Sequence, residues 1–64
     1  MEAIFYFNTK AQANKFAKEL RAHFILTERV TEYVVRIFNW KGIKDEYRDS
    51  ALARAKKIYN EIMK

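Results

Sequence analysis

The amino-acid sequence predicts an α+β fold in which two helices pack on one face of a three-stranded, antiparallel-type sheet, forming a two-layer sandwich. Three observations carry this prediction. Residues 2–8 and 23–40 are rich in aromatic and β-branched residues, which favour strands. Residues 9–22 and 45–63 repeat apolar residues every three or four positions, which is typical of amphipathic helices. The chain has only 64 residues, so we expect one compact domain over residues 1–64 with the element order β-α-β-β-α.

The first strand is expected within Glu2–Asn8. Successive side chains of a strand point to opposite faces, so Phe5 and Phe7 share one side while Ile4 and Tyr6 share the other. Both sides are apolar. This pattern fits a strand that is covered on both faces, or one whose outer face binds a partner.

The first helix is expected over Thr9–Ala22. It opens with a Thr9-x-x-Gln12 capping box, in which the threonine oxygen accepts an otherwise unpaired N–H while the glutamine reaches back. His23 follows at a helix-to-strand junction, where a C-terminal capping role is favoured over a catalytic one. The apolar stripe of this helix is expected to consist of Ala13, Phe16, Ala17, Leu20 and Phe24.

The segment His23–Trp40 is too long for a single strand, whose usual length is about five or six residues. We expect a hairpin with strands around Phe24–Thr27 and Tyr33–Trp40. No Asn-Gly or Asp-Gly pair marks the turn, which we place within Glu28–Glu32. The single glycine of the chain, Gly42, follows the second of these strands and ends the hairpin.

The second helix is expected to begin at a cap formed by Asp45 or Asp49 and to extend to about Met63. Carboxylates near a helix start also interact favourably with the helix dipole. The core stripe of this helix is expected to consist of Tyr47, Ala51, Ala55, Ile58 and Ile62.

A right-handed strand–helix–strand crossover leaves room for the third strand between the first two. The resulting arrangement is ferredoxin-like and lacks the last strand of that fold. The order of elements resembles that of RNA-recognition domains, ACT domains and peptidoglycan-binding SPOR domains. The resemblance concerns topology, and topology alone does not imply a function.

The alternation of the strands predicts an aromatic interaction face on the side of the sheet away from the helices. If Tyr33, Val35 and Ile37 face the helices, the residues between them face outward. Three interpretations apply: a protein interface, including a homodimer, a surface on which bases stack, or ordinary core covered within the chain. The expected members of this face are Tyr6, Arg36, Phe38 and Trp40.

The formal net charge of +5 is concentrated in the two helices. Residues 9–22 carry +3 and residues 41–64 carry +3, whereas residues 23–40 are neutral. Such surfaces could bind the phosphates of a nucleic acid, although lysine-rich helix faces also serve solubility. The candidate phosphate-binding residues are Lys10, Lys15, Lys18, Arg21, Arg54 and Lys57.

Several chemistries are not expected from this composition. The chain has no cysteine and one histidine, which argues against a metal site, because structural zinc needs four nitrogen or sulfur ligands. No phosphate-binding glycine loop or other catalytic motif is present, so we expect neither an enzyme nor a cofactor nor a small-molecule substrate. A membrane span needs about 18 or more apolar residues in a row, and this sequence has no such run. We therefore expect no membrane partner and a cytoplasmic protein.

These observations predict a small, non-enzymatic binding or regulatory protein that acts on nucleic acid, or on a complex that handles it, through the basic helix face and the aromatic sheet face. The alternative is a protein–protein interaction module or inhibitor that homodimerises, or docks on a larger protein, without contacting nucleic acid. Lys, Ile, Asn, Phe and Tyr make up 27 of the 64 residues. This bias is typical of AT-rich genes, including those of many bacteriophages, whose small basic proteins often regulate nucleic-acid complexes.

Overall fold

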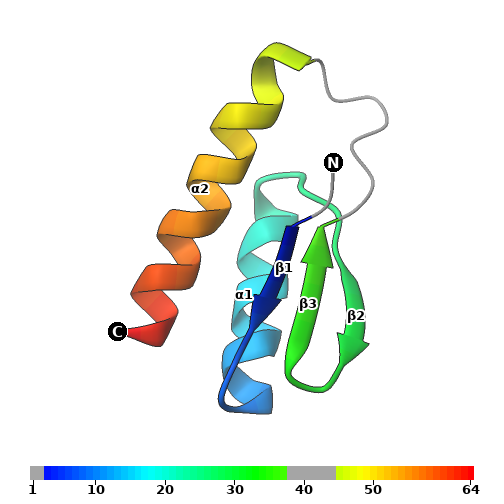
Figure 1. The fold of residues 1–64 in the computed structure, drawn as a ribbon, viewed down its shortest axis with the longest axis vertical. Helices are drawn as coiled ribbons and strands as arrows, with labels where there is room; N and C mark the ends of the chain where they lie inside the picture. The colour runs from blue at the N-terminus through cyan, green and yellow to red at the C-terminus, as the bar shows by residue number, and fades with distance from the viewer. Residues whose placement is uncertain (1–2, 38–44) are drawn as a thin grey trace.

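The computed structural model describes residues 3–37 and 45–64. It has the predicted element order and the predicted α+β class, with a three-stranded sheet and two helices (Figure 1). The elements are β1 (Ala3–Tyr6), α1 (Lys10–Ala22), β2 (Glu28–Thr31), β3 (Val34–Ile37) and α2 (Asp45–Met63).

The strand order in the sheet is β1-β3-β2, so the third strand lies between the first two, as predicted. Both pairings are antiparallel: Phe5 lies opposite Val35, and Glu28 lies opposite Arg36. In Figure 1, α1 lies behind the sheet and α2 stands beside α1, on the side of β1. No helix of residues 3–37 and 45–64 covers the opposite face of the sheet, which makes that face the first place to look for an interaction surface.

The core lies between the sheet and the helices and is centred on aromatic rings. Phe16 of α1 is fully buried, and its ring centroid lies 4.8 Å from that of Phe5 and 5.0 Å from that of Phe7. Tyr59 of α2 contacts the same two rings, each at 5.2 Å. Tilted and edge-on ring pairs of this kind stabilise a core beyond the area they bury. The other buried core residues are Ala13, Leu20, Ile25, Val35, Ile37, Ala55 and Ile58.

The start of α1 confirms the predicted capping box. The backbone N–H of Gln12 donates to Thr9 Oγ1 at 3.1 Å, and the side-chain oxygen Oε1 of Gln12 accepts from the backbone N–H of Thr9, also at 3.1 Å. The same Gln12 oxygen accepts from the Asn8 N–H at 3.0 Å. These bonds satisfy donors that the first helical turn cannot pair internally, and they fix the point at which the chain leaves β1.

The end of α1 corrects the predicted stripe. His23 is the C-cap, as predicted, but Phe24 does not join the core: it has a φ of 62° and is 89% exposed. Its N–H donates to Arg21 O at 2.9 Å, and the Ile25 N–H donates to Leu20 O at 2.9 Å. These two bonds form a Schellman motif, which reverses the chain and makes Ile25, not Phe24, the next core residue.

The hairpin is present, but its strands and turn are shifted from the prediction. Residues 24–27 are not a strand; β2 is Glu28–Thr31, the segment that was expected to hold the turn. The turn is formed by Glu32 and Tyr33, and the Tyr33 N–H donates to Thr31 Oγ1 at 3.1 Å. A threonine side chain therefore stabilises a turn that has no glycine. Tyr33, expected to face the helices, is 46% exposed.

The second helix confirms its predicted length and most of its stripe. It begins at Asp45 and ends at Met63, so Asp49 lies inside it and does not cap it. Tyr47 is 57% exposed and was wrongly assigned to the core, because the stripe begins one turn later. The stripe residues that contact the core are Ala51, Ala55, Ile58 and Ile62.

Candidate interaction surfaces

The helix-free face of the sheet, which we call the open face, is formed by alternate residues of β1 and β3. Ile4 and Tyr6 are 46% and 63% exposed, whereas Phe5 between them is buried. On β3, Val34 lies opposite Tyr6 and Arg36 lies opposite Ile4, and both are half-buried. The predicted alternation is thus confirmed for the described residues, and the structure brings Tyr6 and Arg36 together on one face.

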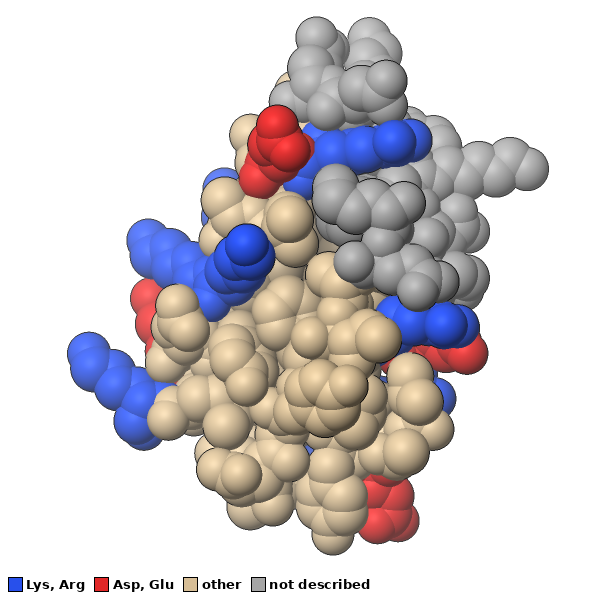
Figure 2. Space-filling view, in the orientation of Figure 1, with Lys and Arg blue, Asp and Glu red and all other residues tan. Residues whose placement is uncertain are grey.

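The open face combines the uncharged residues Ile4, Tyr6 and Val34 with one ion pair, which Arg36 of the central strand forms with Glu28. Figure 2 shows residues without charge across the middle and lower part of this side of the molecule, with Lys and Arg at the left margin, near the top and at the right margin. Arg36 donates from Nη2 to Glu28 Oε2 of β2 at 2.6 Å, so the charge of this face is matched by a neighbouring carboxylate. Phe38 and Trp40, the other two predicted members, lie outside the described residues.

Each outer edge of the sheet carries a feature that hinders pairing with another strand. On the β1 edge, Tyr59 Oη of α2 donates a hydrogen bond to Tyr6 O at 2.8 Å. This carbonyl would otherwise be available to accept a hydrogen bond from an added strand. The β2 edge has an irregular register between Arg29 and Thr31, and its four residues are exposed and mostly polar. Bulges and charged side chains are devices that prevent edge-to-edge pairing. The geometry therefore favours contact through a face of the sheet rather than through an added strand.

The predicted basic residues lie on the helices and not on the open face. Lys10, Lys15, Lys18 and Arg21 are exposed on α1, and Arg54 and Lys57 are exposed on α2. The structure brings Lys18 and Arg21 together beside one pocket. The aromatic and the basic candidates therefore form separate surfaces.

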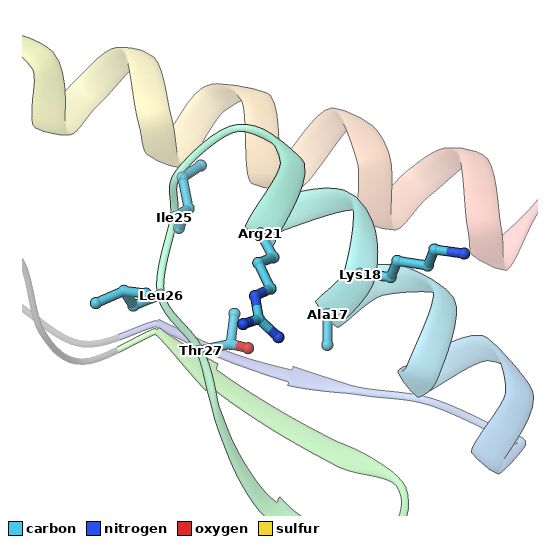
Figure 3. A pocket seen from close by; sticks show the side chains of 6 residues that line it. All are labelled: Ala17, Lys18, Arg21, Ile25, Leu26 and Thr27. Carbon is cyan, nitrogen blue, oxygen red and sulfur yellow. The ribbon is translucent and has the colours of Figure 1, made fainter.

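The pocket beside α1 is a feature that the sequence did not reveal. It has a volume of about 340 Å³ and lies between α1 and the segment that leads to β2 (Figure 3). In Figure 3 the Arg21 side chain extends toward Thr27, whereas Lys18 points away along the helix. No local pattern could have indicated this pocket, because it depends on the chain reversal at Phe24. Its lining residues are Ala17, Lys18, Arg21, Ile25, Leu26 and Thr27.

Two further observations concern other kinds of site. Within residues 3–37 and 45–64, no three His, Cys, Asp or Glu side chains lie close enough together to hold one metal ion. In the same part of the chain, no helix has the length and apolar character needed to cross a membrane.

In comparisons with known proteins, no family model, curated protein or solved structure matches this chain. The fold and the surfaces described above define its class: a small α+β protein with an open, partly aromatic sheet face and basic helices. Because many functions share one fold, a function for this protein must be argued from those surfaces.

Proposed function

We propose that this protein acts by binding another protein through the open face, and that it is not an enzyme. The observation that carries the proposal is the exposure of Ile4 and Tyr6 on the open face, where Tyr6 lies opposite Val34. Tyrosine is enriched at protein interfaces because it combines a large apolar ring with a polar tip. An apolar patch rimmed by charge is the typical appearance of such an interface.

The charge distribution favours a protein partner over a nucleic acid at this face. A surface on which bases stack also needs cations for the phosphates. Of the described residues of the open face, Arg36 is the one cation, and it is hydrogen bonded to Glu28. The six basic candidates lie on the helices instead. A partner that contacts Tyr6 would therefore meet mainly uncharged surface.

A second copy of the chain is the first partner to test, since the open face would be covered in a symmetric dimer. We expect the wild-type protein to sediment as a dimer at about 100 µM, a concentration at which weak interfaces are populated, and Tyr6→Ser to sediment as a monomer. Lys57→Ser is the matched control, because it removes an exposed side chain from α2. Thermal unfolding of each variant confirms that the fold is retained.

A monomeric wild type would exclude self-association and leave a heterologous protein as the partner. Affinity capture from the native cell, with and without nuclease, then tests that case. We expect the wild-type chain to retain a partner protein after nuclease treatment, and we expect the Tyr6→Ser variant to lose that partner. If Tyr6→Ser captures the same proteins as wild type, the open face is not the binding surface and the proposal is wrong.

Direct binding of nucleic acid is a second candidate, favoured by the exposed cations of α1. If these side chains bind phosphates, reversing Lys15 and Lys18 to Glu should weaken binding to every nucleic-acid sequence tested. The slope of log affinity against log salt should fall by about one for each phosphate that the variant no longer neutralises. Unchanged affinity in this double variant, or no salt dependence, would rule out this candidate.

A further inference from the structure

Three exposed cations of α1 share one stripe along the helix. A helix turns by about 100° per residue, so Lys10, Lys18 and Arg21 lie within about 80° of one another around its axis. Asn14 lies on the same stripe, four residues from each of the two lysines. Lys15 lies off the stripe, about 120° around the axis from Arg21. The stripe therefore carries cations at each end and an uncharged turn between Lys10 and Lys18.

A cation of β2 occupies this uncharged turn. Arg29 Nη1 donates to Asn14 Oδ1 at 2.6 Å, so the guanidinium of Arg29 lies beside the stripe. The other two acceptors of this guanidinium are the backbone oxygens of Thr31 and Glu32. All three acceptors are neutral, so these bonds leave the positive charge in place. The structure thus places four cations in one line, which we call the basic row: Lys10, Arg29, Lys18 and Arg21.

The pocket beside α1 belongs to the same surface. It lies between the helix, at Lys18 and Arg21, and residues 25–27. In Figure 3 the Arg21 side chain extends across the pocket toward Thr27. Arg29, which bonds to α1, comes two residues after Thr27 in the chain. The pocket and this bond therefore show independently that the chain leading into β2 runs along the stripe of α1.

The charges of the basic row are not balanced by neighbouring acids. In the part of the chain that the structure describes, no carboxylate forms an ion pair with any of the four side chains. The cation of the open face differs in this respect, since Arg36 is paired with Glu28. Glu19, the one acidic residue of α1, lies about 160° around the helix axis from Arg21. The basic row is thus a surface of unmatched positive charge, which attracts an anionic partner.

The length of the basic row fits the backbone of a nucleic acid. Lys10 and Arg21 are about 17 Å apart along the helix axis, at about 1.5 Å per residue. Each strand of a duplex carries one phosphate for about every 3.4 Å of its axis, so about five phosphates span the row. Sites for single strands add aromatic side chains on which the bases stack. The residues described in the row and in the adjoining pocket are all non-aromatic, which favours a duplex.

We infer that the basic row binds the sugar–phosphate backbone of a double-stranded nucleic acid, through contacts that do not depend on the base sequence. This inference rests on the second candidate function, direct binding of nucleic acid, and specifies both the residues and the form of the nucleic acid. Lys18 and Arg21 contribute exposed side chains, and Arg29 contributes a charge that hydrogen bonds hold in place. The row is separate from the open face, whose described residues Tyr6 and Arg36 belong to β1 and β3.

The test is fluorescence anisotropy of a labelled DNA duplex of about 16 base pairs, in two unrelated sequences, with the full chain. We expect Lys18→Gln and Arg21→Gln each to bind both duplexes about eightfold more weakly than wild type at about 100 mM sodium chloride. This factor follows because each lost phosphate contact lowers the slope of log affinity against log salt by about 0.9. Lys15→Gln is the matched control, an exposed lysine of the same helix outside the row, and should bind almost as tightly as wild type. Arg21→Lys, which keeps the charge, should do the same.

The outcomes separate the basic row from the candidate function on which it rests. If the wild-type protein shows no salt-dependent binding to either duplex, both are wrong. If it binds, but Lys15→Gln weakens binding as much as Arg21→Gln does, the charge acts without the row and only the inference is overturned. Tighter binding to a single strand of the same length, or to a polyglutamate peptide of equal charge, would also overturn it. Circular dichroism should show the wild-type helix content in every variant, since the altered side chains are exposed.

Discussion

The guanidinium of Arg29, an exposed side chain of β2, connects α1 to the hairpin turn. Its Nη1 donates to Asn14 Oδ1 at 2.6 Å, and its Nη2 donates to Glu32 O at 2.8 Å. Its Nε also donates to Thr31 O at 3.4 Å. A single side chain thus holds a turn without glycine in place and ties it to a helix from a different part of the chain.

Replacing Arg29 by Met keeps the aliphatic stem and removes these bonds. Each of these exposed bonds is weak, but one substitution removes all of them together. We therefore expect the free energy of unfolding to fall by about 1 kcal/mol. Arg54→Met on α2 is the matched control and should change stability by less than about 0.5 kcal/mol. Urea unfolding followed by circular dichroism measures both. Equal effects would mean that Arg29 does not hold the hairpin.

Phe16 and Leu20 are fully buried on the face of α1 that contacts the sheet. Truncating a buried Phe or Leu to Ala costs about 2–5 kcal/mol, and a domain of this size has little more than about 5 kcal/mol in total. We therefore expect Phe16→Ala or Leu20→Ala to unfold much of the protein at 37 °C. Lys18→Ala, on the same helix but exposed, should leave the thermal unfolding curve almost unchanged. A folded Phe16→Ala protein at that temperature would contradict the described core.

At the scale of elements, α2 protects the sheet as well as completing the core. The ring of Tyr59 packs among the aromatic residues of β1 and α1, and its hydroxyl donates to Tyr6 O at the outer edge of β1. In Tyr59→Phe the ring packing remains and only the hydrogen bond is removed. We expect stability to fall by about 0.5–1.5 kcal/mol, and aggregation on heating, measured by light scattering, to increase because the edge is open. Tyr47→Phe, at an exposed tyrosine of the same helix, should change neither quantity.

The sequence was sufficient to predict the features of the fold that depend on residues close together in the chain. The capping box of Thr9 and Gln12, the alternation of Phe5 and Tyr6, and the position of β3 at the centre of the sheet were all predicted. These follow from short-range chemistry and from the few topologies open to five elements. For the same reason, the described half of the predicted aromatic face, Tyr6 and Arg36, lies where it was expected.

The errors occurred where the chain reverses without the glycine that usually marks a reversal. The stripe of α1 was extended to Phe24 because no glycine marks the helix end; the Schellman reversal there occurs without one. The hairpin turn was misplaced because it depends on the side chains of Thr31 and Arg29 in place of a glycine pair. The pocket beside α1 could not be predicted, since it forms only after this reversal has brought residues 25–27 alongside the helix.

At the scale of the whole molecule, the net charge of +5 opposes any association between copies of the chain. If the open faces pair, two like-charged molecules approach each other, and added salt screens their repulsion. We therefore expect the dimer to become tighter as sodium chloride rises from about 50 to about 200 mM, whereas binding to a nucleic acid would weaken over the same range. Sedimentation equilibrium at both salt concentrations measures this. A dimer that dissociates as salt rises would mean that ion pairs, and not the apolar open face, hold it together.

The position of β3 at the centre of the sheet also has a consequence for the order in which the protein folds. β3 follows β2 after a turn of two residues, whereas its other neighbour, β1, is separated from it by α1 and the whole of β2. Closing a longer loop costs more entropy and delays the contact that depends on it. The hairpin and α1, joined by the bond between Arg29 and Asn14, should therefore assemble early. The segment that carries Phe5 and Phe7 should pack against them later, and this packing should be the step that completes the aromatic core.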